Sequence, residues 1–266
     1  MTGNATMQEI EYPRMFEAED DHWWYLGMQA ITRAILDRRV PRDPGQQILD
    51  AGCGTGGAMA NYLGDYGIVT GFDISRLALD FCKQRRLHRL AQASADAIPF
   101  AAASFNIVAC FDVIYMLNGT AKAVQEFERV LKPGGHLLLR VAANDWLRGK
   151  HDLAVRTVHR FSAKEVEGLL RGAGLRPLHS SYVNTFLFPL AVAKRLLEDI
   201  LEPAAHSSDL SRMPRAIEAL LRRILAGEAR IASRARLPFG LSVFALARKP
   251  DGEKSVRVAG VNSPPS

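Results

Sequence analysis

The sequence predicts an α/β fold in which helices cover both faces of a mostly parallel sheet. Three observations predict it. Short apolar segments alternate along the chain with amphipathic segments of helical length. Four glycines follow the first apolar segment within "LDAGCGTGG", residues 49–57. Acidic residues stand at or just after the ends of several apolar segments, which is the edge where ligands of such sheets bind.

Seven segments have the length and apolar character of strands buried in such a sheet. They are residues 46–52, 67–73, 90–94, 105–117, 136–143, 175–183 and 241–249. Because helical segments separate most of them, we expect a Rossmann-like, seven-stranded, mostly parallel sheet.

Four helices are expected between these strands, at 57–64, 75–87, 120–131 and 162–174. Ser75 is a typical N-cap residue for the second of them. Ser162 and Glu165 have the spacing of a capping box, which predicts where the fourth helix begins. The "KPGG" that follows the third helix predicts its end.

Two additions flank the domain expected at 46–249. Residues 1–45 are expected to form an N-terminal helical lid, with Trp23, Trp24 and Tyr25 preceding a helix at 27–39. Residues 184–240 are expected to form a helical cap inserted before the last strand, with helices at 189–202 and 215–232. One face of the latter helix is predicted to carry Ile217, Leu220, Leu221, Ile224, Leu225 and Ile231. The tail, 250–266, is expected to be disordered.

The composition favours a cytoplasmic protein. The three cysteines, Cys53, Cys82 and Cys110, form no CxxC pair, which suits unpaired thiols in a reducing compartment. No run approaches the roughly 18 uncharged apolar residues of a membrane span. The acidic N-terminus lacks the apolar core of a signal peptide. The net charge of +6 permits an anionic partner without specifying one, and we expect no metal site.

The glycine loop is compatible with two ligands. Gly52, Gly54 and Gly57 satisfy GxGxxG, and Asp73 follows at the distance of a dinucleotide fingerprint. However, Asp50 stands two residues before the first glycine, where a carboxylate would repel a pyrophosphate but could organise a loop that faces an ammonium group. Asp96 follows the third strand, where it could accept a hydrogen bond from an adenine amino group. These residues argue against NAD.

The segments "LDAGCGTG", "GFDIS", "ASADAIPFAAASFNIVACFDVI" and "LKPGGHLLLRV" resemble the successive motifs of class I S-adenosylmethionine-dependent methyltransferases. The similarity is to the small-molecule type that includes ubiquinone-biosynthesis enzymes, and it covers residues 46–183 and 241–249. The aromatic run after His22 also resembles an N-terminal motif of many bacterial members. The resemblance implies S-adenosylmethionine as the cofactor and methyl transfer to an oxygen or nitrogen of a small molecule.

The resemblance also implies which residues hold the methionine and ribose parts of the cofactor. Asp50, Gly52 and Gly54 would form the loop around the methionine part. Asp73 would accept hydrogen bonds from both ribose hydroxyls. A carboxylate has enough lone pairs for this task, and glycine lets the backbone approach the ligand closely.

At the adenine and the reacting methyl, the resemblance implies a second set of residues. Ile74 would pack on the adenine, with Asp96 and Ala97 at its edge. Phe111 would present its backbone beside the sulfonium. Trp24 has two interpretations, as an indole that covers the cofactor or as a residue that fastens its helix to the domain.

The general base is left open by the sequence. Many relatives carry a His after the fourth strand, in a pattern like "DVLEH", where this chain has "DVIYM". Tyr115 lies in that segment, but its ordinary pKa near 10 makes it a poor base. His151 and His159 lie in the long loop 144–162 and have the appropriate intrinsic pKa, although both could be plain loop residues. His22 competes with them.

The acceptor is expected to be small: a secondary metabolite, a sugar or a lipid-like molecule. Residues 203–240 hold seven arginines and three acidic residues. The simplest interpretation is a helix face exposed to solvent. The alternatives are an anionic acceptor and contact with an anionic membrane surface. Two alternatives are an RNA or protein methyltransferase and a non-catalytic S-adenosylmethionine-binding subunit. No NPPY-like motif follows the fourth strand, so no nucleic-acid partner is expected.

Overall fold

The three-dimensional structure is a computed structural model of the 266-residue chain. It describes residues 7–148, 152, 157–193 and 213–251. His151, most of the helix expected at 189–202, and nearly all of the expected tail therefore lie outside the described residues.

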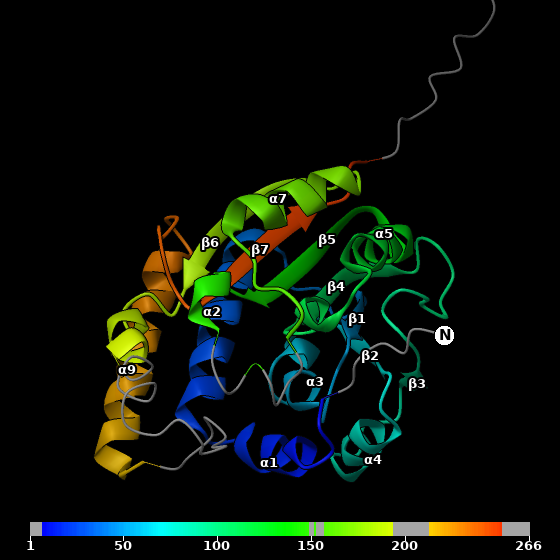
Figure 1. The fold of residues 1–266 in the computed structure, drawn as a ribbon. Helices are drawn as coiled ribbons and strands as arrows, with labels where there is room; N and C mark the ends of the chain where they lie inside the picture. The colour runs from blue at the N-terminus through cyan, green and yellow to red at the C-terminus, as the bar shows by residue number, and fades with distance from the viewer. Residues whose placement is uncertain (1–6, 149–151, 153–156, 194–212, 252–266) are drawn as a thin grey trace, which may run out of the picture.

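A seven-stranded sheet forms the centre of the fold, in the order β3-β2-β1-β4-β5-β7-β6 (Figure 1). The strands are β1 (Gln47–Ala51), β2 (Ile68–Asp73), β3 (Leu90–Gln92), β4 (Phe105–Phe111), β5 (Leu131–Ala142), β6 (Arg176–Val183) and β7 (Ser242–Arg248). Pairing is parallel from β3 across to β5, whereas β7 runs antiparallel to both of its neighbours. The predicted seven-stranded, mostly parallel sheet is confirmed.

Two strand boundaries differ from expectation. β4 ends at Phe111 rather than at 117, because Asp112 adopts a left-handed backbone (φ 59°) that turns the chain into the short 3-10 helix η2 (Ile114–Met116). β5 begins at Leu131 and includes the "KPGG" residues. An irregularity in the pairing between Phe105 and Ile107 of β4 accommodates them.

Helices α5 (Thr120–Val130) and α7 (Ala163–Gly172) cover one face of the sheet. Their core residues include Phe127 and Leu170, which pack with alternate residues of β5 such as Leu137 and Leu139. The predicted capping box is present, because the Ser162 side chain accepts from Glu165 N and the Glu165 side chain accepts from Ser162 N.

Helices α2 (Trp23–Arg39) and α9 (Arg215–Ala232) pack on the opposite face. They lie side by side (Figure 1), and Gly27 of α2 allows close approach, since a Cβ there would overlap the side chain of Leu225. The inserted helix thus extends a helical layer along the sheet. The aromatic residues expected before the helix instead form the first turn of α2, and the His22 ring caps it by accepting from Trp24 N at 3.3 Å.

The buried face of α9 differs from the predicted one. Leu221 and Leu225 are buried as expected, together with Glu228, Ala229 and Ala232. Ile217, Leu220 and Ile231 are exposed instead. The apolar arc of this helix is wider than the surface that α2 covers, so part of it faces solvent.

Several shorter elements connect these strands and helices. They are α1 (Glu11–Ala18), α3 (Gly57–Asn61), η1 (Leu63–Asp65), α4 (Arg76–Gln84) and η3 (Asp145–Leu147). The predicted Ser75 N-cap is confirmed by its hydrogen bond from Ala78 N. All three cysteines are buried and unpaired by disulfides. None of the helices in the described ranges is both long and apolar enough to cross a bilayer.

Candidate functional site

The glycine loop follows β1 and requires bare backbone. Gly52, Gly54 and Gly56 all have left-handed φ angles of 74°, 53° and 84°. A Cβ at Gly52 would overlap the Val113 side chain. Even alanine would therefore be strained here, both by this overlap and by the left-handed backbone. Gly52 N and Cys53 N donate to the carbonyl of Phe72 at 2.8 and 2.9 Å, which fixes the loop at the end of β2.

Three carboxylates surround this loop. Burial, together with the charges of Glu19 and Asp73, raises the pKa of Asp50 to about 8. Burial likewise raises the pKa of Glu19 to about 7. Asp50 Oδ2 is buried and has no hydrogen-bond partner among the residues that the structure describes. Such a cluster disfavours its own ionisation and would be stabilised by a cation placed beside it.

Asp73 ends β2 and is held against the glycine loop. Its Oδ2 accepts from Gly54 N at 3.0 Å, and its Oδ1 accepts from Ser75 N at 2.8 Å. Burial raises the pKa of Asp73, while these two hydrogen bonds oppose the rise. Each carboxylate oxygen has a second lone pair, so further donors such as sugar hydroxyls can bind.

The expected adenine side follows β2 and β3. The Ile74 side chain is exposed at the end of β2. Asp96 and Ala97 lie in a turn closed by a hydrogen bond from Ala97 N to the carbonyl of Ser94 at 3.0 Å. Asp96 is partly buried and Ala97 is exposed. The three residues thus lie beyond the carboxyl ends of neighbouring strands, as the pairing of Asp73 with Gln92 requires.

A buried arginine that the sequence analysis did not single out lies at the end of β5. Arg140 Nε and Nη2 donate to Asp112 Oδ2 at 2.8 and 2.5 Å. Its guanidinium lies 5.3 Å from the Trp24 ring and 5.0 Å from the Phe111 ring. Trp24 and Phe111 are therefore brought together, with Arg140 between α2 and the sheet. An arginine inside the apolar run "HLLLRVAA" was the available signal.

Helix α1 lies over the glycine loop. The Met15 side chain covers Gly54, and the Glu19 carboxylate lies where a Cβ of Gly57 would be. Glu19 Oε2 accepts from the hydroxyl of Thr55 at 2.5 Å. Neither Met15 nor Glu19 was expected at this site, because nothing in the acidic N-terminal sequence marks which carboxylate turns inward.

Arg85, the residue that follows α4, holds this N-terminal segment in place. Its guanidinium donates to the carbonyls of Thr55 and Phe16 at 3.1 and 3.0 Å, and to the carboxylates of Asp20 and Glu19 at 2.6 and 3.3 Å. It also lies 4.5 Å from the Phe16 ring centre. The Arg85 side chain is almost fully buried, so it joins α1, α4 and the glycine loop in one polar network.

The candidate bases lie in the loop after β5. The His159 ring places Nδ1 2.9 Å from Asp145 Oδ2 and Nε2 3.4 Å from Glu165 Oε1. Its backbone N–H donates to the carbonyl of Tyr115 at 3.3 Å, so two of the three candidates are neighbours. Burial raises the pKa of the Tyr115 hydroxyl well above its usual value, which makes this side chain a still poorer base. The third, His151, is not among the described residues.

A buried ion pair fixes this loop on the sheet. Arg160 Nε and Nη2 donate to the two Asp152 oxygens at 2.8 and 3.0 Å, and Nη1 donates to the carbonyl of Ala143 at 3.1 Å. His22, the remaining competitor, is almost fully buried at the start of α2. Within the described ranges no group of His, Cys, Asp and Glu has the arrangement of a metal site.

Residues 49–139 match a family model described as a methyltransferase domain. The chain is 36% identical over 122 residues to a malonyl-[acyl-carrier protein] O-methyltransferase of Enterobacter lignolyticus, covering 45% of this chain and 48% of that protein. It is 39% identical over 118 residues to the Bacillus subtilis methyltransferase YodH, covering 42% and 49%. The chain therefore spans about half the length of these two curated relatives.

Among solved structures, the complex between a Haloferax volcanii methyltransferase and the Trm112 methyltransferase activator matches with a TM-score of 0.60 at 20% identity, covering 92% of this chain and 98% of the matched one. At this identity the similarity concerns the fold. The fold, the glycine loop and the matched domain all indicate the same family. The carboxylates around the glycine loop suit a cofactor with a positively charged sulfur. Residues 49–139 therefore match a methyltransferase domain, and the chain has the Rossmann-like fold of the class I S-adenosylmethionine-dependent methyltransferases.

Proposed function

We propose that this chain transfers a methyl group from S-adenosylmethionine to an oxygen or nitrogen of a small-molecule acceptor. The observation that carries the proposal is the carboxylate cluster on the glycine loop, with Asp50 Oδ2 buried and unpartnered within the described chain. S-adenosylmethionine supplies an electrophilic methyl carbon on a cationic sulfur, and its methionine part carries an ammonium group. Asp50, Glu19 and Asp73 provide negative charge where those cations would lie.

The proposed cofactor residues follow the edge of the sheet. Gly52 and Gly54 let the backbone lie against the methionine part, and Asp73 accepts hydrogen bonds from the ribose hydroxyls. Exposed Ile74 offers an apolar surface to the adenine, beside Asp96 and Ala97. Phe111, the last residue of β4, borders the reacting methyl through its backbone. The chain's own task is to align donor and acceptor and to exclude water.

For a hydroxyl acceptor, His159 is the proposed proton acceptor. Asp145 lies at hydrogen-bond distance from Nδ1 and would hold the imidazole in one orientation, as carboxylates do for catalytic histidines. Nε2 would take the proton, and to do so it must turn away from the Glu165 carboxylate that lies 3.4 Å from it. Tyr115 would then be a positioning residue, because its carbonyl accepts from the backbone of the His159 segment. His151 remains the competing candidate. An amine acceptor that is already neutral would need neither histidine.

The two added segments are proposed to enclose the acceptor. Trp24 and Arg140 border the site from the α2 side, and Trp146 in η3 meets Phe188 of the insert with ring centres 5.8 Å apart. Aromatic walls with an arginine suit a flat, lipid-like or anionic small molecule. The similarity to an O-methyltransferase of Enterobacter lignolyticus supports an oxygen acceptor over a nitrogen one.

The test is incubation of the purified protein with methyl-labelled S-adenosylmethionine and a metabolite extract, followed by mass spectrometry of small molecules. We expect a labelled product smaller than any protein or nucleic acid. The Asp73→Ala variant and the extract alone are the controls. Label that appears only in RNA or protein supports the macromolecular alternative, and no labelled product with intact cofactor binding supports the non-catalytic subunit.

A further inference from the structure

Exposed apolar side chains are concentrated in the segment inserted before β7. The structure describes residues 184–193 and 213–240 of this insert. These two short ranges hold seven of the twelve exposed large hydrophobic residues in the described part of the chain. They are Phe186, Leu190, Met213, Ile217, Leu220, Ile231 and Phe239. Such a concentration marks an interaction surface rather than scattered exposure.

On α9 these residues form a continuous stripe. Ile217, Leu220, Ile224 and Ile231 recur at helical spacing and therefore share one side of the helix. Leu220 is 57% exposed, so its side chain projects into solvent although α9 is well packed elsewhere. The same spacing places Arg223 and Arg230 along the outer border of the stripe.

The turn at 184–186 is joined to α9 beside this stripe. The carboxylate of Glu228 accepts hydrogen bonds from Asn184 N at 2.5 Å and Phe186 N at 3.0 Å. Ile224 and Ile231 stand four residues before and three residues after Glu228, so they flank the same side of the helix. Phe186, itself 50% exposed, thereby continues the stripe onto the neighbouring segment.

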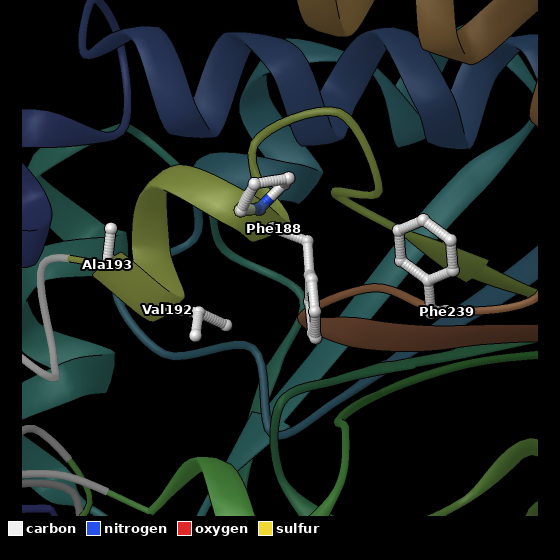
Figure 2. Close-up of a pocket in the computed structure, with 5 residues that line it drawn as sticks. Phe188, Val192, Ala193 and Phe239 are labelled. Carbon is white, nitrogen blue, oxygen red and sulfur yellow. The ribbon is translucent and has the colours of Figure 1, made fainter.

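A wide, open depression of about 500 Å³ lies within the same insert, and only apolar residues line it. Figure 2 shows Phe188 and Phe239 from the two parts of the insert, with Val192 and Ala193 on the helical turn that follows Phe188. The Phe188 and Phe239 rings lie 5.4 Å apart. Leu190, which is 62% exposed, extends the apolar character beyond the depression.

The charges around this surface are almost all positive. Between 213 and 240 there are six exposed arginines, at 215, 222, 223, 230, 234 and 236. Arg223 and Arg230 border the stripe, whereas helical spacing places Arg215 and Arg222 on the opposite side of α9 and Arg236 pairs with Glu167 of α7 at 3.3 Å. The acidic residues in the same range are Glu218 and Glu228, and Glu228 is fully buried. A symmetric contact between two copies of the chain would bring these arginines face to face, which is unfavourable. An anionic lipid surface complements both the apolar stripe and its basic border.

We propose that the insert surface, formed by residues 184–193 and 213–240, docks the protein on an anionic lipid bilayer. The apolar stripe of α9 and the side chains of Phe186 and Leu190 enter the interfacial layer, and the arginines contact lipid headgroups. This is a membrane-binding activity separate from methyl transfer, and it places the apolar depression at the lipid interface.

The experiment is co-sedimentation of the full-length protein with phosphatidylcholine vesicles that contain or lack phosphatidylserine. We expect binding to the anionic vesicles, weak binding to the neutral ones, and release by added salt. The double variant Phe186→Ser, Leu220→Ser should lower partitioning roughly tenfold. Arg223→Gln with Arg230→Gln should lower it by roughly tenfold or more.

Matched controls lie outside the insert. Ile68→Ser changes an exposed apolar residue at the start of β2, and Arg76→Gln changes an exposed arginine of α4, so neither should alter vesicle binding. Equal binding to both kinds of vesicle, no binding to either, or unchanged binding by the insert variants would overturn the proposal. So would a dimer that dissociates in Phe186→Ser, Leu220→Ser. A lower melting temperature with unchanged vesicle binding would assign the stripe to packing within the chain.

Discussion

The carboxylate of Glu19, the residue that follows α1, accepts a 2.5 Å hydrogen bond from the hydroxyl of Thr55 in the glycine loop. This contact joins the N-terminal segment to the loop that precedes α3. It adds a third carboxylate to the pair formed by Asp50 and Asp73. The N-terminal segment is therefore part of the candidate cofactor site, and its attachment has measurable consequences.

The attachment of α1 depends on Arg85. Replacing Arg85 with Ala leaves the buried Glu19 carboxylate without its cation, so we expect the free energy of unfolding to fall by about 3 kcal/mol. Limited proteolysis should also cleave the chain near α1 sooner than in the wild type. Arg76→Ala, which changes the exposed arginine at the start of α4, is the matched control. Equal stability of the two variants in urea would contradict the role of Arg85.

The raised pKa values of Asp50 and Glu19 predict an unusual dependence of stability on pH. Both carboxyls bind a proton more tightly in the folded chain than in the unfolded chain, where the pKa is about 4. Their stabilising contribution is thus present at low pH and is lost as the pH rises through about 7 and 8.

We therefore expect the urea midpoint of the ligand-free protein to fall between pH values of about 5 and 8. Asp50→Asn removes one of the two groups and should make the midpoint less dependent on pH. A midpoint that stays level or rises over this range would contradict the carboxylate cluster as the structure presents it, because carboxylates whose pKa lies below about 4 are already ionised throughout the range.

His159 is predicted to act in turnover and not in cofactor binding. For a hydroxyl acceptor, His159→Ala should lower kcat by roughly 10²–10⁴-fold, with the dissociation constant of S-adenosylmethionine unchanged. Asp145→Asn should lower kcat less, because the imidazole remains but loses its orienting carboxylate. His151→Ala is measured in parallel. Near-native turnover in both histidine variants would show that neither removes a proton and would favour an amine acceptor.

Gly52 is predicted to be the most sensitive glycine of the loop. Gly52→Ala combines a left-handed φ of 74° with overlap against Val113, so we expect a loss of about 2 kcal/mol or more in the free energy of unfolding. Gly168→Ala is the control, because this helical glycine of α7 has open space at its Cβ position and alanine there should stabilise by about 0.5–1 kcal/mol. Similar effects at both positions would contradict the loop geometry.

The arrangement of the sheet was predictable because local signals agree with it. Apolar strands, caps at Ser75 and Ser162, and acidic residues at the strand ends all indicate the same α/β fold, and the structure confirms them. Positions near the ends of parallel strands meet at one edge, so Asp50, Asp73 and the glycine loop could be grouped before their contacts were known.

Contacts that depend on tertiary packing were not predictable. Arg140 is paired with Asp112 because β5 pairs with β4 in one register. The sequences of the two strands do not determine that register by themselves. The buried side of α9 depends on how much of its apolar arc α2 covers, which is why Ile217 and Leu220 were placed on the wrong side. Glu19 reaches the glycine loop through tertiary contacts with Thr55 and Arg85, which the N-terminal sequence alone does not indicate.

Isothermal titration calorimetry tests the central claim most directly. Wild-type protein should bind S-adenosylmethionine and its demethylated product with micromolar affinity, and Asp73→Ala should weaken both by about 1.5–3 kcal/mol. Binding should also release protons near neutral pH, because the bound cation lowers the raised pKa of Asp50. Heat from NADH with none from S-adenosylmethionine would contradict the account.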